Sequence, residues 1–410
     1  MIGEAASDGI SPHQEVLAGF GTGACVITRT EGAPRSNVAE ALVSLSPLFS
    51  KKSFSDLPGW EPDDHLAAFA AFRRSAFHAL VKPYRTGALG VDFAAFADAY
   101  AEARAVSLAD RSTARTFFER HFTPALVAAE AGGAGLVTGF YEPHVVASPV
   151  RTVDFTVPLL SRPADLVDID DGNRPAGMDP YLAFARRTAS VPVEYHDRGE
   201  IERGALAGQN LGIAWLADKV DAFFIHVQGA ARLSMTDGRL CRVTYAAKSG
   251  QRFTGPGKVL SEMGEIPLEK VTMQSIRAWF KANPHRVDEI LWRNRSYIFF
   301  REAPVDDAAL GPIAAAKVPL APGRSVAVDR LLHTFGTPFY IAAPGLTAFD
   351  GKPFRRLMIA QDTGSAITGP ARGDLFAGSG DAAGEIAGVV RNAADFYALV
   401  PRALFAEACP

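Results

Sequence analysis

The sequence between residues 296 and 360 alternates between short apolar runs and turn-forming residues. Five runs have the length and composition of strands: 296–301, 318–320, 325–328, 339–343 and 357–360. Pro322-Gly323, Gly336-Thr337-Pro338 and Gly345 separate the last four runs from one another. Short strands at such intervals are typical of small closed β-structures, so this part of the chain predicts a compact barrel.

Two aspartates follow the last of these runs. Asp362 comes where the run 357–360 ends, and Asp374 lies in the stretch after it. The glycines and proline of that stretch predict a loop of tight turns; they are Gly364, Gly369, Pro370, Gly373, Gly378 and Gly380. A strand and a loop can thus bring two carboxylates into one cleft, where one keeps its proton near neutral pH and acts as an acid. In local sequence terms, the commoner alternative is that both aspartates only cap turns.

The N-terminal third predicts helices behind a flexible leader. Residues 1–57 mix Gly, Ser and Pro without a lasting period, which favours a flexible leader. Apolar residues then recur at helical spacing over 63–81, 91–105 and 108–122. Their aromatic stripes are typical of a packed core rather than of a cofactor site.

From Gly135 the pattern changes to β-structure. The run 135–143 predicts a strand that ends in a proline turn, with Thr138, Tyr141 and Glu142 near its end. The runs 150–160 and 191–195 also predict strands, 181–189 a short helix, and 233–246 a hairpin around an Asp-Gly turn.

The run 222–230, AFFIHVQGA, predicts a further strand, with His226 and Gln228 on one face. Lys248 follows nearby in sequence, so this half of the chain is rich in hydrogen-bonding groups. A polar and aromatic strand surface suits sugars, although a solvated sheet face is the plainer alternative. Helices are predicted at 271–281 and 287–292, and 393–399 predicts a helix followed by a strand.

Composition sets limits on function. The chain has 410 residues and a net charge of −3, so it is long enough for two or three domains and gives no electrostatic case for nucleic acid. Cys25, Cys241 and Cys409 lie far apart, without metal-ligand or disulfide spacing. His144, His196 and His333 also lack metal-ligand spacing.

The N-terminus does not indicate export. It carries acidic residues, no basic region and only a weak apolar patch, which makes a poor signal peptide. Gly21 to Cys25 faintly resembles a lipoprotein cleavage site, but the apolar segment that such a site requires is missing. A disordered leader or a misplaced start codon is the better interpretation.

Several collinear motifs over residues 135–400 resemble the MltA family of lytic murein transglycosylases. The matching segments are Thr138-Gly-Phe-Tyr-Glu-Pro143, Asp221 to Gly229 with Arg232, Val243 to Lys248 with Gly250, Tyr297 to Phe300, Gly323 to Asp329 with Gly336-Thr-Pro338, and the Asp362/Asp374 stretch. Each motif is weak alone, but together they are specific. Where the family usually has Gly-Ser-Gly-Arg this chain has Gly229-Ala-Ala-Arg232, and His226 replaces a frequent Gln.

The resemblance implies a fold that is mainly β with N-terminal helices. A double-psi β-barrel domain would carry an inserted second β-domain, with a groove between the two. We expect a leader at 1–57, a helical segment and the first part of the barrel at 58–140, the inserted domain at 141–270 and the catalytic barrel at 271–410.

The resemblance also implies the function. The enzyme would cut the β-1,4 bond between N-acetylmuramic acid and N-acetylglucosamine in peptidoglycan and leave 1,6-anhydromuramic acid ends. Asp374 matches the single catalytic acid, and Asp362 matches a second acidic residue beside it. Thr138, Tyr141, Gln228 and Lys248 are predicted to bind the glycan, with framework hydrogen bonds as the alternative role.

No cofactor, metal or nucleic acid is expected. The implied partner is the glycan strand of peptidoglycan. The protein is expected to be a monomer unless it forms complexes with other cell-envelope proteins. The implied location is the periplasmic side of the cell envelope, in the periplasm or at the outer membrane. Two rivals stay open: a non-catalytic, expansin-like glycan-binding protein, and a plain hydrolase that uses both aspartates with water.

Overall fold

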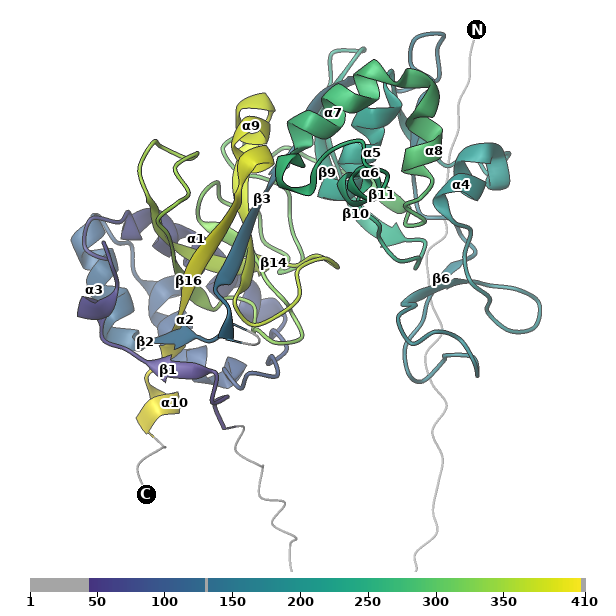
Figure 1. Ribbon diagram of the computed structural model, residues 1–410. Coiled ribbons are helices and arrows are strands. Elements are labelled where there is room, and N and C mark those ends of the chain that lie inside the picture. Colours follow the sequence, from purple (N-terminus) through teal and green to yellow (C-terminus); the bar gives the residue numbers. More distant parts are fainter. Residues whose placement is uncertain (1–43, 130–131, 407–410) are drawn as a thin grey trace, which may run out of the picture. The chain divides into compact units, whose positions relative to one another are not determined.

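A computed structural model describes residues 44–129 and 132–406 (Figure 1). Most of the predicted leader, together with Cys25 and Cys409, lies outside the described residues. Within the described ranges no helix is long and apolar enough to cross a membrane.

The first described segment packs three helices beside a short strand. β1 (Phe49–Lys51) precedes α1 (His65–Val81), α2 (Ala97–Ala105) and α3 (Arg111–His121). Asp64 and Asp110 cap α1 and α3 by accepting hydrogen bonds from backbone N–H groups of the first turn. All three predicted helices are therefore confirmed, although the second begins as a 3-10 helix, η2 (Phe93–Phe96). β1 lies inside the predicted leader, so that segment is structured at its end.

The largest sheet has eight strands in the order β1-β2-β16-β13-β14-β12-β15-β3. The other members are β2 (Phe122–Val127), β3 (Gly135–Glu142), β12 (Ser325–Ala327), β13 (Pro338–Ala343), β14 (Phe354–Asp362), β15 (Arg372–Ser379) and β16 (Arg391–Pro401). β16 also pairs with β3, and Figure 1 shows these two strands side by side. Six strands, from β16 through β13, β14, β12 and β15 to β3, therefore close into a ring.

Three predictions in this region differ from the structure. The glycine-rich stretch is not a loop throughout, because residues 372–379 form β15. Gly373 serves close packing rather than a turn, since a Cβ there would lie 2.9 Å from the Phe396 ring. Residues 391–401 form a single long strand, β16, rather than a helix followed by a strand. The predicted strand 318–320 is reduced to an isolated bridge at Pro319.

A second sheet has the order β11-β10-β9-β4. Its strands are β4 (His144–Ala147), β9 (Ala230–Met235), β10 (Leu240–Lys248) and β11 (Ile298–Ala303). β9 and β10 form the predicted hairpin around Asp237-Gly238. β11 pairs with β10, so this sheet takes in residues beyond 270, where the sequence analysis ended the inserted domain.

Two smaller two-stranded sheets lie in the same part of the chain. β5 (Val157–Leu160) pairs with β8 (Gly212–Leu216), and β6 (Leu166–Asp168) pairs with β7 (Phe184–Arg186). β7 lies within the segment 181–189, so the short helix predicted there was wrong. Of the predicted strand 191–195, one residue, Val193, makes a bridge.

The remaining helices are α4 (Arg198–Glu200), α5 (Lys219–Gln228), α6 (Pro256–Glu262), α7 (Met273–Ala282), α8 (Val287–Leu291), α9 (Asp381–Val389) and α10 (Ala403–Ala406). A π-helix, η4 (Ile201–Ala205), continues α4. α5 contradicts the strand predicted at 222–230. Asp218 caps its start, and Gly229 ends it in the left-handed conformation at φ +77°.

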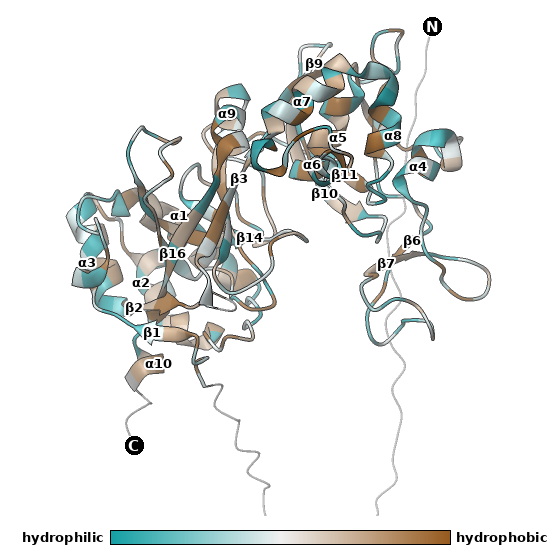
Figure 2. Cartoon of the chain, in the orientation of Figure 1, coloured by the Kyte–Doolittle hydropathy of each residue, from teal (hydrophilic) through white to brown (hydrophobic). Residues whose placement is uncertain are grey.

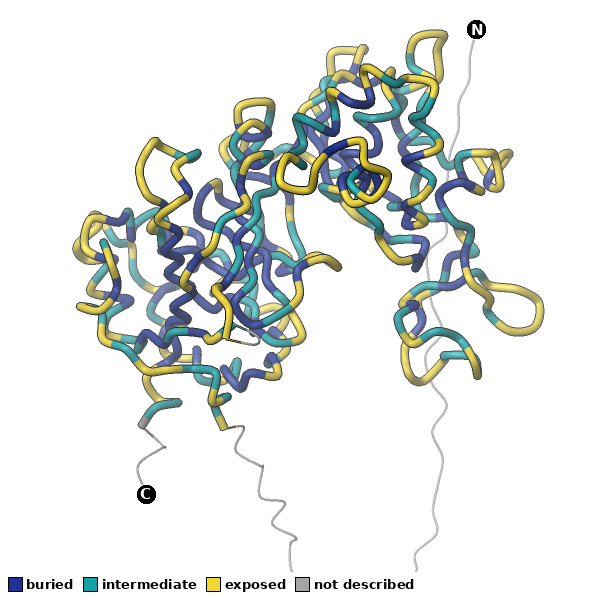
Figure 3. The backbone as a smooth tube through the Cα atoms, in the orientation of Figure 1, coloured by how far each residue is buried: buried dark blue, intermediate teal, exposed yellow. Residues whose placement is uncertain are grey.

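The core is strongly apolar. Strands β13 and β14 contribute buried residues to a cluster that also holds the aromatic residues of the N-terminal helices. Figure 2 shows apolar residues along the strands, and Figure 3 shows buried stretches within the large sheet and α1. β13 is buried along its whole length and β14 along most of it. Rigid packing of this kind fixes the strand registers, and these registers position the polar residues at the ends and edges of the strands.

Candidate functional site

Asp374 lies directly opposite Thr138 in the parallel β15–β3 ladder. The Thr138 hydroxyl donates a hydrogen bond to Asp374 Oδ1 at 2.5 Å. Within the described ranges this is the single side-chain hydrogen bond to Asp374, so Oδ2 remains available. The β-branched Thr138 suits a strand and has few side-chain conformations, which holds the donor in place.

Strand register brings Asp362 into the same row. Ala327 on β12 pairs with Asp374 on one side and with Asp362, at the end of β14, on the other. Neighbouring strands lie about 4.8 Å apart, so the two aspartate Cα atoms are separated by about 10 Å. The β12–β14 register shifts at a β-bulge between Val326 and Ala327, and Ala327, the small residue between the two aspartates, is buried. The predicted carboxylate pair is thus assembled by three strands rather than by a strand and a loop.

The surroundings of Asp362 favour its protonated form. Burial is the main cause that raises its pKa, to about 6, and the charge of Asp374 raises it further. The backbone N–H groups of Thr363 and Ala315 and the charge of Lys317 act in the opposite direction. The Ala315 N–H donates to Asp362 Oδ1 at 3.2 Å.

Asp374 is also half-buried, and burial raises its pKa. The Thr138 hydrogen bond and the positive charge of Arg372 oppose that rise. Arg372 donates to the Thr138 oxygen at 2.7 Å, so Thr138 accepts from the guanidinium and donates to the carboxylate. Arg372 was missed by the sequence analysis; its place two residues before Asp374, on the same face of a strand, was the available signal.

Three other predicted residues do not contact the carboxylate pair. Tyr141 lies on the opposite face of β3 from Thr138 and packs against Ala383 and Ala387 of α9. Gln228 accepts a hydrogen bond from the Tyr141 N–H at 3.0 Å. Lys248 lies over the Tyr181 ring, 5.0 Å from its centroid. The contacts of Tyr141 and Gln228 hold parts of the protein together, which is the framework role given as the alternative.

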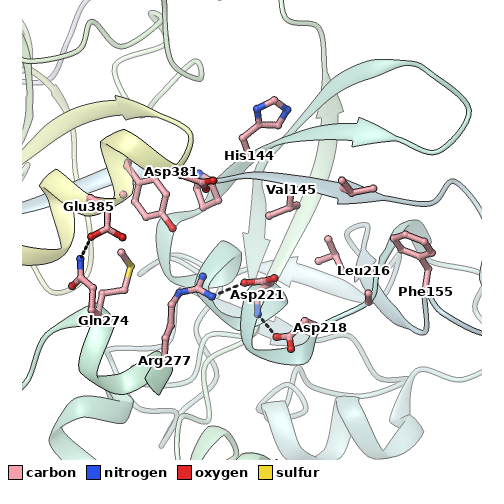
Figure 4. A pocket seen from close by; sticks show the side chains of 16 residues that line it. His144, Val145, Phe155, Leu216, Asp218, Asp221, Gln274, Arg277, Asp381 and Glu385 are labelled. Atoms are coloured by element: carbon pink, nitrogen blue, oxygen red, sulfur yellow. Dashed lines mark hydrogen bonds and ion pairs between the residues drawn. The ribbon is translucent and has the colours of Figure 1, made fainter. Parts of the chain in front are cut away.

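Tyr141 instead lines a separate cavity of about 510 Å³ (Figure 4). Polar and acidic side chains of four elements surround it, namely His144, Asp218, Asp221, Gln274, Arg277, Asp381 and Glu385. Arg277 pairs with Asp221 at 2.6 Å, and Gln274 donates to Glu385 at 3.1 Å. Neither Asp362 nor Asp374 lines this cavity.

No metal site is evident in the part of the chain that the structure describes. No group of three or more His, Cys, Asp or Glu side chains there could hold an ion. His144 bonds to Ser234 and His333 bonds to the carbonyl of Pro370, so both imidazoles have protein partners. Burial lowers the pKa of His333 to about 4.

The ring of strands, the second sheet and the carboxylate pair define a mainly β protein with two half-buried carboxyl groups on the two strands that flank β12. Its 136–301 segment matches the model of the MltA specific insert domain, and 324–400 matches the 3D domain. The chain belongs to the MltA family, which confirms the resemblance seen in the sequence.

Named relatives and solved structures agree with this assignment. A membrane-bound lytic murein transglycosylase from Agrobacterium tumefaciens is 49% identical with a TM-score of 0.83, and the match covers 88% of this chain and 99% of that one. Membrane-bound lytic murein transglycosylase A of Vibrio cholerae is 36% identical, but the match covers 47% of this chain and 52% of that protein. E. coli MltA with bound chitohexaose is 25% identical with a TM-score of 0.63, covering 87% and 96%.

Proposed function

We propose that this protein is a peptidoglycan lytic transglycosylase. It would cut the β-1,4 bond between N-acetylmuramic acid and N-acetylglucosamine and form 1,6-anhydromuramic acid ends. The observation that carries the proposal is the Asp374 carboxyl group, half-buried and held by Thr138 in a row with Asp362. Relatives that are named for this activity, and one that binds a chito-oligosaccharide, support it.

The proposal extends to the domains that would hold the glycan. We interpret the closed ring of six strands as the double-psi β-barrel of the family and the second sheet as its inserted domain. The glycan would lie in a groove between the two. Mixed parallel and antiparallel pairings within the ring, with β12–β14 and β15–β3 parallel, support that interpretation.

The reaction begins with acid catalysis. Protonated Asp374 gives its proton to the glycosidic oxygen through the free Oδ2, while the bond breaks by an oxocarbenium-like state. The burial that raises the pKa of Asp374 favours the protonated form that this step needs. Such proton transfer contributes about 10²–10⁴ in rate, and the remainder comes from positioning of the glycan.

The same group then acts as a base. The Asp374 carboxylate takes the proton from the C6 hydroxyl of the muramic acid residue, whose oxygen attacks C1 of its own sugar. An internal nucleophile has a high effective concentration, so no second protein nucleophile is needed. The Thr138 hydroxyl stabilises the carboxylate between the two steps because it is a donor.

Asp362 acts through electrostatics. The charge of Asp374 is one of the causes that raise the pKa of Asp362, and repulsion between like charges acts on both carboxyl groups. Asp362 then supports a protonated Asp374 without touching the glycan. Lys248 remains a proposed glycan contact, whereas the contacts of Tyr141 and Gln228 favour their framework role.

The decisive test is the mass of the products from purified sacculi. The anhydro route adds no water to each cut, whereas a hydrolase that uses both aspartates would add one. A non-catalytic glycan-binding protein would release nothing. Asp374→Asn should bind glycan strands and release no anhydro-muropeptides, and cleavage near the wild-type rate would overturn the assignment.

We further propose that the protein works without a cofactor, on glycan strands of the cell envelope and on its periplasmic side. The membrane-bound relatives support an envelope location.

A further inference from the structure

A buried charge cluster surrounds Glu142, the last residue of β3. Its side chain has no exposed surface, and Arg232 and Arg242 both bind it. Arg232 Nη2 and Arg242 Nη2 donate to Oε2 at 3.0 and 3.2 Å, and Arg242 Nε donates to Oε1. Ser379 Oγ donates to Oε2 at 2.6 Å. We call these four residues the Glu142 hub.

The hub joins the two sheets. Glu142 and Ser379 come from β3 and β15 of the large sheet, where they are register partners. Arg232 and Arg242 come from β9 and β10 of the second sheet, where they also pair with each other. Two guanidinium groups on one carboxylate leave an excess positive charge in a buried place, and such a charge persists only when further acceptors surround it.

Those acceptors are carbonyl oxygens of the segment that follows β11. Arg232 donates to the carbonyls of Ala308 and Leu310 at 3.2 Å each, and Arg242 donates to that of Leu310 at 3.1 Å. The hub therefore holds this segment as well as the two sheets.

One path leads from the hub to Asp374. The β3–β15 ladder runs in register from Leu136 to Phe140 and shifts before its last pair, Glu142 and Ser379. The hub fixes that last pair across the shift. Thr138 stands four residues before Glu142, so the hub secures the end of the strand that places the Thr138 hydroxyl against Asp374.

A second path leads to Asp362. The segment held at Ala308 and Leu310 continues to Ala315, whose N–H donates to Asp362 Oδ1. The next N–H, of Ala316, donates to the carbonyl of Gln361. Between Leu310 and Ala315, the Gly311 N–H donates a hydrogen bond to the carbonyl of Leu320. A short, tethered segment thus connects the arginines to the second carboxylate.

We propose that the Glu142 hub is the positioning device of the active site, through which the inserted sheet sets the placement of both Asp374 and Asp362. This inference rests on the proposed function. Glu142, Arg232 and Arg242 act through other residues and do not touch the glycan. Arginine is required at both places because a planar fork reaches a carboxylate and a carbonyl together, which a lysine ammonium does not.

The test compares Arg242→Lys with a matched control. Arg242→Lys keeps the charge beside Glu142 but loses the fork. The control is Glu202→Gln, which removes the ion pairs that Glu202 makes with the buried Arg198 at 2.9 Å and with Lys219 at 3.1 Å, in the second sheet's part of the chain. The measurements are kcat and KM on purified sacculi, the pH profile of kcat, the thermal midpoint, and an NMR titration of the aspartate carboxyl carbons.

Arg242→Lys should lower kcat about tenfold or more with KM changed by less than about twofold, since a 1 Å misplacement can cost about 10²-fold. Its pH profile and the titrations of Asp362 and Asp374 should move. Glu202→Gln should lower the thermal midpoint and leave the pH profile unchanged. Wild-type kcat and titrations in Arg242→Lys, or equal shifts in the control, would overturn the proposal.

Two further results keep the test decisive. If Arg242→Lys does not fold, Ser379→Ala removes one hub contact and no charge, and it should shift the same titrations; unchanged titrations would overturn the hub. If the wild-type protein releases no anhydro-muropeptides, the proposed function fails. The carboxyl titrations still decide whether the hub positions the aspartates.

Discussion

Asp362 and Asp374 are both register partners of one residue, Ala327, on the strand between them. Their separation is therefore set by the spacing of backbone hydrogen-bonded strands and not by flexible loops. Strand spacing hardly varies, so the electrostatic coupling of the two carboxyl groups is built into the sheet. A substitution that removes the charge of Asp374 should accordingly lower the pKa of Asp362.

Thr138→Val should lower kcat by about tenfold or more, because a hydrogen bond to a charged group is worth about 1.5–3 kcal/mol. The pKa of Asp374 should rise, since the variant loses a contact that lowers it. The pH profile of kcat should therefore move to higher pH. Thr138→Ser keeps the hydroxyl and serves as the control; equal loss in both variants would contradict the role of the hydrogen bond.

Asp362→Asn should stabilise the protein at high pH. The pKa of Asp362 rises from 3.8 to about 6 on folding, so its ionised form is disfavoured in the folded state. The cost is fully present above pH 6, absent below about pH 4, and amounts to about 2–3 kcal/mol. Asparagine still accepts the Ala315 hydrogen bond and carries no charge.

Urea unfolding at pH 8 and pH 4 checks this expectation. The variant should gain stability at pH 8 and lose the gain at pH 4. Asp350→Asn is the control with the opposite sign, because Asp350 is exposed and the slight burial that raises its pKa is outweighed by the Lys352 N–H and Arg356, which lower it. If Asp362→Asn gained the same stability at both pH values, the cost of ionised Asp362 in the folded state would not be the cause.

Gln228→Ala tests the framework role of Gln228. Loss of its bond to the Tyr141 N–H should cost about 1 kcal/mol of stability. KM for sacculi should stay unchanged, because the residue makes no contact with the carboxylate pair. A raised KM at unchanged stability would restore the predicted glycan-binding role.

Treatment with EDTA should leave the rate of sacculus cleavage unchanged. The proposed mechanism uses a carboxyl group and the substrate's own hydroxyl, so no step requires a cation. Activity that is lost on chelation and restored by a divalent ion would contradict the mechanism.

The strands of the C-terminal ring are easier to predict from the sequence than the elements between them. Apolar runs such as 339–343 and 357–360 are short and bounded by turn residues, which leaves strand as the natural interpretation. The run 222–230 has the same composition but forms α5. An apolar segment that is buried on several sides shows no clear helical or strand period. The composition of 222–230 therefore favoured a strand, although the segment is helical.

The end signals of α5 were nevertheless present. Asp218 lies at the N-cap and Gly229 at the left-handed C-terminus, and the two together mark a helix. The error moved Gln228 from a helix end to a strand face, and so it affected the predicted glycan surface.

Both aspartates were found in the sequence, but their geometry was not. Only the parallel pairing of β15 with β3 reveals that Thr138 faces Asp374, and these residues are separated by more than half of the chain. The Glu142 hub is of the same kind, since Arg232 and Arg242 lie 90 and 100 residues from Glu142. Contacts of such long range leave no periodic signal in the sequence.

The last strand of the ring, β16, pairs with β2, β13 and β3. Ribosomal synthesis must therefore pass residues 391–398, which pair with β3 and β13, before the ring can close. A nascent chain that stops before Arg391 already carries both aspartates but lacks the strand that completes their scaffold. We expect such a truncated chain to lack the proposed activity, because Thr138, which binds Asp374, also pairs with Arg391 of the missing strand.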